Sequence, residues 1–219
     1  MEQPEIRVLL VDHQEMVRCG LQRLLDDMPG LQVVGEACTG EEAVQLSRRL
    51  RPDVVLMDVQ IPGIGGLEVV RRISRFEADI RVVVVASQAD DLFPIRLLEA
   101  GAGGYLSKHC GIEEISEAIT VVCRGERYIS ADVARQMALS ALPGGGQSPL
   151  ERLTQRELQV MLMVAQGQTV HDISANLCLS SKTISTYRYR LYEKLGVGND
   201  VELARLAIRC GVVGIAVQP

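Results

Sequence analysis

Four polar residues in the first half of the chain follow directly on short apolar runs and have side chains suited to chemistry. Asp12 and His13 follow IRVLLV, Asp58 follows VVLM, and Lys108 follows GYLS. If these runs are neighbouring strands, the two carboxylates meet in one place, where their like charges are costly unless a cation lies between them. Lys108 and a bound divalent metal ion are the expected cations. Such a cluster can bind Mg²⁺ and accept a phosphoryl group.

The apolar runs predict the elements that would position these residues. They are too short for helices and rich in Val, Ile and Leu, as buried parallel strands are. The five expected strands cover residues 6–11, 31–35, 54–57, 81–86 and 104–106. Their alternation with five helical segments predicts an α/β doubly wound fold with a five-stranded parallel sheet. The functional crevice of such a sheet lies at the carboxyl ends of its strands, where the four polar residues are expected.

The second half of the chain has the pattern of a connector followed by a small helical domain. Residues 131–141 predict a short amphipathic helix, and residues 142–149 a Gly-rich linker that either lets the domains move or is a simple spacer. Helix-start signals then recur at Thr154, Thr169, Ser180 and Asp200. They predict an all-α four-helix domain that contains a helix-turn-helix. The expected domain boundaries are 1–125, 126–152 and 153–219.

The third of these helices, residues 181–195, carries three of the five tyrosines together with Arg, Ser and Thr. Exposed side chains of these types suit the major groove of DNA, where they reach base edges or phosphates. The alternative is a solvated helix face with tyrosines in the core, and Tyr187 is the first candidate for the core. Residues 150–219 hold eight basic and six acidic side chains, whereas residues 1–149 hold fifteen and twenty-two. This asymmetry favours nucleic-acid binding by the second half.

Composition and length narrow the class of protein. The 219 residues, 47% hydrophobic and 23% charged, fit two globular domains of modest size. No window approaches eighteen uninterrupted apolar residues, and the N-terminus runs directly into a strand pattern, so we expect neither a membrane span nor secretion. The six cysteines form no CxxC pair, which predicts reduced and mostly buried thiols in a cytoplasmic protein.

Three blocks of the first half, VLLVDHQEMVRCGL, DVVLMDVQIPGIGGLEVVRRI and EAGAGGYLSK, resemble the signature blocks of the flavodoxin-like receiver domains of two-component response regulators. The resemblance implies that Asp58 is the phosphoacceptor for a sensor histidine kinase and that Lys108 contacts a phosphoryl oxygen. It also implies a Mg²⁺ site formed by Asp12, Asp58 and the main-chain carbonyl of Gln60.

Two positions depart from the receiver pattern. His13 stands where the family has a second acidic metal ligand, and because Mg²⁺ prefers oxygen ligands we expect weaker Mg²⁺ binding. Ala86 stands where receivers carry a switch Thr or Ser, and its methyl group cannot donate a hydrogen bond. Ser87 can substitute only if the strand has already ended or bulged there. Tyr105, at the position of the aromatic residue that follows the switch, is retained.

The second half, LTQRE…GQTVHDISANLCLSSKTISTYRYRLYEKLGV, resembles the LuxR- or NarL-type DNA-binding domain, and within that family the chain resembles global regulators of the GacA/UvrY type. The resemblance implies binding of double-stranded promoter DNA by a homodimer that reads palindromic half-sites. The implied DNA contacts are Ser185, Thr186 and Tyr189 to bases and Lys182 and Arg188 to phosphates. The implied dimer helix, residues 201–210, includes Val201, Leu203, Ala204 and Ala207.

Together these patterns predict a cytoplasmic DNA-binding transcriptional response regulator, not an enzyme, in which phosphorylation of Asp58 controls dimerisation and DNA binding. Two alternatives stay open. His13 and Ala86 also permit a degenerate receiver, a phosphorylation-independent dimerisation or ligand- or partner-sensing module on a constitutive DNA-binding regulator. The acidic cluster with its aspartate nucleophile also permits hydrolysis of phosphate esters, but such chemistry would make the helix-turn-helix superfluous.

Overall fold

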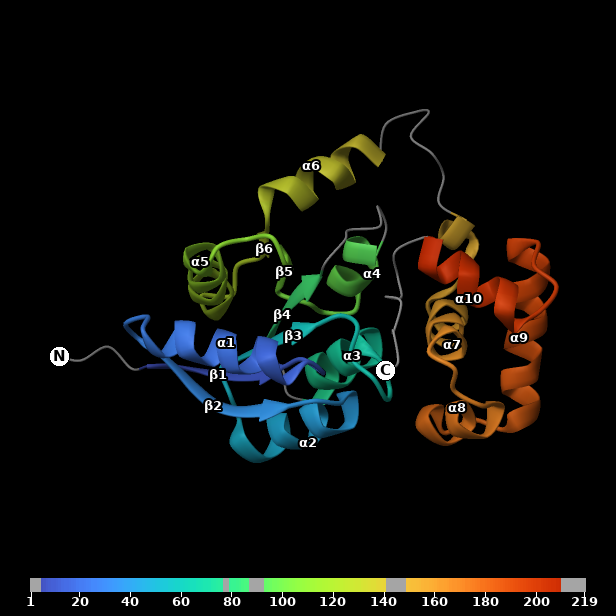
Figure 1. The fold of residues 1–219 in the computed structure, drawn as a ribbon, viewed down its shortest axis with the longest axis horizontal. Coiled ribbons are helices and arrows are strands. Elements are labelled where there is room, and N and C mark those ends of the chain that lie inside the picture. The colour runs from blue at the N-terminus through green and yellow to red at the C-terminus, as the bar shows by residue number, and fades with distance from the viewer. Residues whose placement is uncertain (1–4, 77–78, 87–92, 141–148, 210–219) are drawn as a thin grey trace.

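The structure, a computed structural model, describes residues 5–76, 79–86, 93–140 and 149–209. Figure 1 shows an α/β domain formed by the first half of the chain beside a helical domain formed by the second half. Helix α6 (Ala131–Ser140) follows the sheet and packs against β5 and α4. The fold class expected from the sequence is therefore confirmed.

A six-stranded parallel sheet forms the centre of the first domain, in the order β2-β1-β3-β4-β5-β6. The strands are β1 Ile6–Val11, β2 Leu31–Ala37, β3 Val54–Asp58, β4 Arg81–Ala86, β5 Gly104–Ser107 and β6 Tyr128–Ile129. The expectation of five strands was wrong by one, because β6 lies beyond the expected boundary at residue 125 and pairs with β5. This two-residue strand covers the backbone groups of what would otherwise be an edge strand. The strand order reverses between β1 and β3, which marks the crevice of such a sheet.

Helices cover both faces of the sheet. They are α1 Glu15–Asp26, α2 Gly40–Leu50, α3 Gly66–Phe76, α4 Phe93–Glu99 and α5 Ile112–Cys123. Buried side chains of α1 and α5 pack with one set of strand residues, and those of α2, α3 and α4 pack with the alternate set. Because successive strand side chains point to opposite faces, a strand covered on both sides is apolar throughout, as the sequence runs are.

The helical domain begins with a short 3₁₀ turn, η1 (Pro149–Arg152), and contains α7 Gln155–Ala165, α8 Val170–Leu177, α9 Ser181–Leu195 and α10 Asp200–Arg209. Capping boxes form at Thr154 and Thr169: each threonine side chain accepts the backbone N–H three residues on, and its own backbone N–H donates to the acidic side chain of that residue. Ser180 caps α9 in the same way, without the reciprocal bond. Local hydrogen bonding therefore starts these helices where the sequence predicts.

Helix α7 packs against the α/β domain as well as against the other helices of its own domain. Residues 157–164 are each at most 8% exposed, so the helix is buried on all sides. In Figure 1 it lies between the α/β domain and α9. Toward the α/β domain, Gln159 Nε2 donates to Glu68 Oε2 of α3 at 2.7 Å. Further hydrogen bonds across this boundary join Gln166 to Ile61, Gln168 to Gly63, Arg72 to Asn176 and Arg96 to Leu153.

Two expectations from composition concerned membrane-spanning segments and the burial of the cysteines. Within the described ranges, no helix is long and apolar enough to cross a membrane. The cysteines of the described part are free thiols, but none of them is fully buried, and Cys19, Cys38 and Cys178 are exposed. The expectation of mostly core cysteines was wrong for these residues. Cys19 lies on α1, Cys38 just after β2 and Cys178 at the end of α8, so none of these three belongs to the apolar core.

Candidate functional site

Parallel strand ends bring three of the predicted site residues together. Asp12 follows β1 directly, Asp58 is the last residue of β3, and Lys108 follows β5. Lys108 Nζ lies 2.8 Å from Asp58 Oδ2 and 3.3 Å from Asp12 Oδ2. The ammonium group therefore bridges two carboxylates that are far apart in the sequence, as the strand pattern predicted.

Both carboxylates are buried and held by backbone hydrogen bonds. The side chains of Asp12 and Asp58 are 5% and 2% exposed. Asp12 Oδ1 accepts the amide of Gln14 at 2.8 Å, and Asp58 Oδ1 accepts the amide of Gln60 at 3.1 Å. Burial by itself would lower the pKa of Lys108, but its hydrogen bond to Asp58 and the charges of Asp58 and Asp12 outweigh burial and raise that pKa. Lys108 therefore stays a cation at neutral pH.

His13 completes a cluster of possible metal ligands. Its Nδ1 atom lies 3.6 Å from Asp12 Oδ1 and 3.8 Å from Asp58 Oδ2, and its side chain is 42% exposed. One ligand atom from each of the three residues lies within 4.8 Å of the others. The main chain of Gln60 lies beside them in the turn after β3. The donor set of two carboxylates and one imidazole is suited to a divalent cation.

The region of the expected switch residue lacks a hydroxyl at its predicted position. Ala86 ends β4, is 2% exposed, and accepts the amide of Lys108 through its carbonyl oxygen at 2.8 Å. Ser87 lies outside the described residues. Tyr105 is fully buried within β5. Of these two neighbouring residues, Lys108 therefore offers a polar side chain, whereas Ala86 contributes only a methyl group.

Helix α9 presents most of the predicted DNA-contacting residues to solvent. Lys182, Ser185, Thr186 and Tyr189 are exposed, whereas Ile184 and Leu191 are buried on the opposite side of the helix. Tyr187 is partly buried and packs against the core, in agreement with its predicted position. Figure 1 places α9 on the side of the helical domain that faces away from the sheet. The described part of the α/β domain therefore leaves this helix accessible.

Arg188 differs from the other predicted DNA contacts. Its guanidinium pairs with Asp200 at the start of α10, with Nε 3.1 Å from Asp200 Oδ1, and it also donates to the Tyr192 hydroxyl at 3.2 Å. The side chain is 27% exposed. Arg188 thus joins α9 to α10, and a phosphate contact from it stays a prediction. Sequence reasoning missed this role because the pairing needs the tertiary position of α10.

The exposed face of α10 is not the one expected for a dimer helix. Leu203 and Ala207 are fully buried against the domain core, so two of the four predicted dimer residues lie on the wrong face. Val201 and Ile208 are exposed, and Ala204 is partly buried. Spacing explains the error, since residues four apart share a face and the 203–207 pair belongs to the inner stripe.

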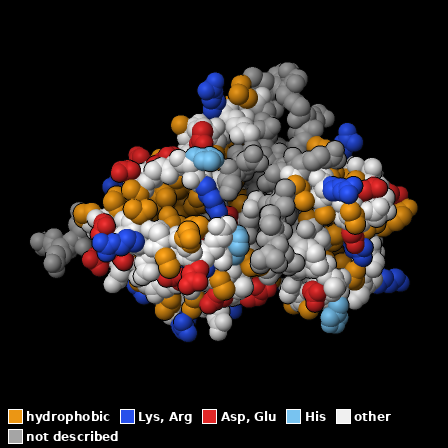
Figure 2. All heavy atoms as spheres, viewed as in Figure 1, with side chains coloured by type: hydrophobic (Ala, Val, Ile, Leu, Met, Phe, Trp, Pro, Cys, Tyr) orange, Lys and Arg blue, Asp and Glu red, His pale blue; other side chains and the backbone are white. Residues whose placement is uncertain are grey.

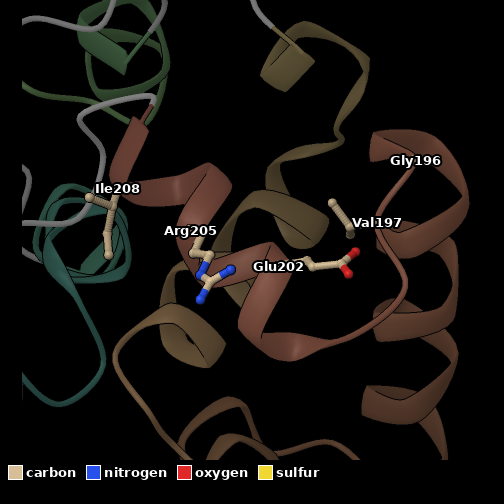
Figure 3. Close-up of a pocket in the computed structure, with 5 residues that line it drawn as sticks. All are labelled: Gly196, Val197, Glu202, Arg205 and Ile208. Carbon is tan, nitrogen blue, oxygen red and sulfur yellow. The ribbon is translucent and has the colours of Figure 1, made fainter.

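A shallow pocket lies along this outer face of α10. Its lining residues are Gly196, Val197, Glu202, Arg205 and Ile208. In Figure 3, Glu202 points toward the loop that holds Val197, whereas Arg205 and Ile208 lie further along the helix. Glu202 Oε2 accepts the amide of Gly198 at 2.7 Å and so holds the loop that leads into α10. The pocket therefore belongs to the junction of α9 and α10.

Apolar side chains also gather on the surface of the α/β domain. Figure 2 shows them over α1 and toward α5. Met16 and Leu24 of α1 are 87% and 48% exposed. Met16 lies three residues after His13, so this apolar surface begins beside the acidic cluster.

Comparisons with known proteins match both halves of the chain. Residues 8–120 match the response regulator receiver domain, and residues 151–207 match the luxR family of bacterial regulatory proteins. The chain is 52% identical to the response regulator GacA of Pseudomonas aeruginosa, over 96% of this chain and 99% of that protein. It is 49% identical to the response regulator UvrY of Escherichia coli, over 94% and 95% respectively. A solved LuxR-family two-component response regulator from Aurantimonas is 36% identical with a TM-score of 0.59, covering 61% of this chain and 96% of its own.

The two matches coincide with the two sites described above. The receiver match contains Asp12, Asp58 and Lys108, and the luxR-family match contains α9. The similarity to GacA and UvrY spans both matches in one alignment. The chain therefore belongs to the LuxR-family response regulators, transcriptional regulators that join a receiver domain to a helix-turn-helix DNA-binding domain, and it is similar over nearly its whole length to GacA and UvrY.

Proposed function

We propose that Asp58 accepts a phosphoryl group from a sensor histidine kinase and that this modification controls dimerisation and DNA binding. The observation that carries the proposal is the contact of Lys108 with both Asp58 and Asp12 at the carboxyl end of the sheet. The exposed apolar side chains of α1 beside this cluster offer a surface for the kinase domain that delivers the phosphoryl group.

In the proposed reaction an Asp58 oxygen attacks the phosphorus of a phosphohistidine on the kinase. The O–P bond to Asp58 forms as the P–N bond breaks, and the kinase histidine retains the electron pair and takes up a proton. Lys108 is positioned to contact an oxygen of the transferred group. A divalent cation held by Asp12, Asp58 and the Gln60 carbonyl would neutralise charge on that group. We expect Mg²⁺ to bind weakly, because His13 replaces an oxygen ligand.

On the output side, a homodimer would place two copies of α9 in successive major grooves of palindromic half-sites. The exposed side chains of Ser185, Thr186 and Tyr189 would contact base edges, and Lys182 a phosphate. Val201, Ala204 and Ile208 on the outer face of α10 are the revised candidates for the dimer contact. Because DNA is the proposed target, we place the protein in the cytoplasm.

A second candidate function is supported by His13 and Ala86. Together they remove one metal-binding carboxylate and one hydroxyl from the receiver pattern, while the accessible α9 could bind DNA without phosphorylation. In this alternative the receiver is a phosphorylation-independent dimerisation or ligand- or partner-sensing module. Turnover of phosphate esters is not expected beyond slow hydrolysis of the aspartyl phosphate itself.

Intact mass spectrometry after incubation with acetyl phosphate and Mg²⁺ separates these candidates. A phosphoryl adduct is expected on the unsubstituted protein and not on the Asp58→Asn variant. The same samples would be tested for promoter binding, and tighter binding is expected only for the phosphorylated protein. The absence of an adduct, with equal DNA binding by both proteins, would establish the phosphorylation-independent alternative.

The DNA interface is tested by two substitutions on α9 and one control. Lys182→Ala is expected to weaken binding to all sequences and to lower the salt dependence by about one counterion. Thr186→Ala is expected to cost about 1 kcal/mol or more for the preferred operator and less for unrelated DNA. Glu126→Gln, on the exposed turn after α5, is the control and should leave both measurements unchanged. If neither α9 substitution alters binding, α9 is not the element that contacts DNA.

A further inference from the structure

We infer that the receiver site prefers a first-row transition metal ion such as Mn²⁺ over Mg²⁺, and that His13 sets this preference as a direct ligand. The inference rests on the proposed function only in placing the metal at the site around Asp58. It concerns which ion this chain selects, which the match to receiver domains does not decide.

The distances from His13 Nδ1 to the two carboxylates are those of ligands around one ion. Two atoms that each lie about 2.1 Å from a metal are about 3 Å apart at a right angle and about 4.2 Å apart on opposite sides. His13 Nδ1 lies 3.6 Å from Asp12 Oδ1 and 3.8 Å from Asp58 Oδ2, between these limits. Asp58 Oδ2 also accepts from Lys108 Nζ at 2.8 Å, so a cation that contacts all three atoms requires small side-chain rotations together with a shift of the ammonium group away from Asp58.

Lys108 does not occupy the oxygen of Asp12 that faces the imidazole. Its Nζ contacts Asp12 Oδ2, whereas Asp12 Oδ1 faces His13 and accepts the amide of Gln14. The carboxylate therefore divides its two oxygens between the lysine and the ligand cluster. The backbone amides of Gln14 and Gln60 also fix the orientation of the two carboxylates, which favours metal binding over a rearrangement of the site.

The chemistry of the donor set determines which ion it favours. Mg²⁺ selects oxygen ligands and keeps much of its water, whereas imidazole suits the later first-row ions and is also accepted by Mn²⁺, which otherwise shares the oxygen ligands of Mg²⁺. A receiver with acidic residues at both positions after β1 offers oxygen atoms alone. Replacement of one of these by His13 removes a negative charge that attracts every divalent cation, but adds a nitrogen ligand that only the transition ions use well. The ratio of the affinity for a transition metal ion to the affinity for Mg²⁺ should therefore rise.

The position of His13 makes it suitable for this role. Its side chain is 42% exposed, so the ring can turn toward the ion without repacking the core. The other two histidines, His109 and His171, are also exposed but are not part of the ligand cluster. They provide matched controls for any signal that a histidine generates.

The test measures binding of Mn²⁺ to the full-length protein by electron paramagnetic resonance, with Mg²⁺ as competitor. The ratio of the Mg²⁺ to the Mn²⁺ dissociation constant is expected to be at least about tenfold larger for the unsubstituted protein than for His13→Asp. Pulsed spectra of bound Mn²⁺ should show coupling to a ligand nitrogen that disappears in His13→Asp and persists in His109→Gln and His171→Gln. Asp58→Asn should weaken binding of both ions, which assigns the signal to this site.

Two results would overturn the inference. One is an equal Mg²⁺ to Mn²⁺ ratio in the unsubstituted protein and His13→Asp, and the other is bound Mn²⁺ without nitrogen coupling. Phosphorylation by acetyl phosphate is scored separately in the same samples. An adduct formed with Mg²⁺ alone, together with an unaltered ratio, would reject the metal preference and leave the proposed function intact. Nitrogen-ligated Mn²⁺ without any adduct would retain the preference and reject phosphorylation at Asp58.

Discussion

At the residue scale, Lys108 is the cation that allows two buried carboxylates to share one end of the sheet. It contacts Asp58 and Asp12 at 2.8 and 3.3 Å, and its own side chain is 23% exposed. Removal of a charge from such a cluster leaves the opposite charges buried and uncompensated, which is costly because water cannot replace the lost partner fully. A divalent cation bound at the same carboxylates would supply part of the missing charge.

Lys108→Met should therefore destabilise the protein in a metal-dependent way. Methionine retains much of the apolar stem, so the loss of charge dominates. In EDTA, the free energy of unfolding is expected to fall by about 1–4 kcal/mol, the range for charges at about 4 Å in water or near a protein surface. Millimolar Mn²⁺ should recover much of this loss, because it binds the folded state.

Urea denaturation with and without metal measures both effects. Lys182→Met, on the exposed surface of α9, is the matched control and should change little under either condition. An identical loss for Lys108→Met in EDTA and in Mn²⁺ would mean that Lys108 contributes through packing alone.

At the element scale, Glu157 links the start of α7 to the end of α9. Its side chain is 3% exposed, completes the capping box with Thr154, and accepts from Lys194 Nζ at 2.7 Å. Burial alone would raise the pKa of Glu157, but the hydrogen bonds from Lys194 and Thr154 lower it below its ordinary value of 4.5. The carboxylate therefore stabilises the folded state above the ordinary pKa, and this stabilisation is lost as the pH falls through the lower pKa of the folded protein.

Glu157→Gln should lower the free energy of unfolding of the helical domain by about 1–3 kcal/mol at pH 7, because Lys194 loses a charged partner. The difference from the unsubstituted protein should narrow as the pH falls below 4.5, where the carboxyl group takes up a proton. Urea denaturation followed by circular dichroism at several pH values measures this trend.

The exposed Glu193 of α9 offers the control for this experiment. Glu193→Gln should cost less than about 0.5 kcal/mol, since exposed charges on a helix contribute little. A difference between Glu157→Gln and the unsubstituted protein that is constant from pH 7 to pH 4 would contradict the role of the charge.

At the scale of the whole molecule, the turn after β3 contacts the DNA-binding domain. Ile61 and Gly63 lie three and five residues after Asp58, and their carbonyl oxygens accept from Gln166 and Gln168. The next contact along the chain joins Glu68 to Gln159, both buried. A change in the conformation of this turn would therefore alter its hydrogen bonds to the residues that end α7. Helix α7 in turn packs against α9 and α10.

Gln159→Glu should separate the two domains. The substitution keeps the shape of the side chain but places a second carboxylate 2.7 Å from Glu68 Oε2, where repulsion replaces a hydrogen bond. Amide hydrogen exchange in α3 and α7 is expected to increase, and the radius of gyration from solution X-ray scattering should rise.

Two further variants make this experiment specific. Gln45→Glu, on the exposed face of α2, adds the same charge away from the boundary and should leave exchange and size unchanged. The double variant Glu68→Gln with Gln159→Glu restores one carboxylate and one amide and should regain much of the protection. If Gln159→Glu exchanges and scatters like the unsubstituted protein, the domains are not held by this contact in solution.

Five strands, the helix starts and the site residues Asp12, Asp58 and Lys108 were predictable from the sequence. Each depends on a local pattern: apolar runs of strand length, capping residues at fixed spacing, or polar residues at strand ends. Parallel pairing then brings the strand ends to the same edge of the sheet, so local patterns were sufficient to predict this part of the site.

Only the tertiary structure decided the remaining features. Strand β6 exists because β5 offers it an edge, Arg188 pairs with Asp200 of the next helix, and Leu203 faces inward because α7 lies there. The domain boundary joins Gln159 to Glu68, 91 residues apart, through polar side chains that have no distinguishing local pattern. Sequence spacing encodes which side chains share a face, but the partner of that face is chosen by packing between distant segments, where burial and hydrogen bonding are determined together.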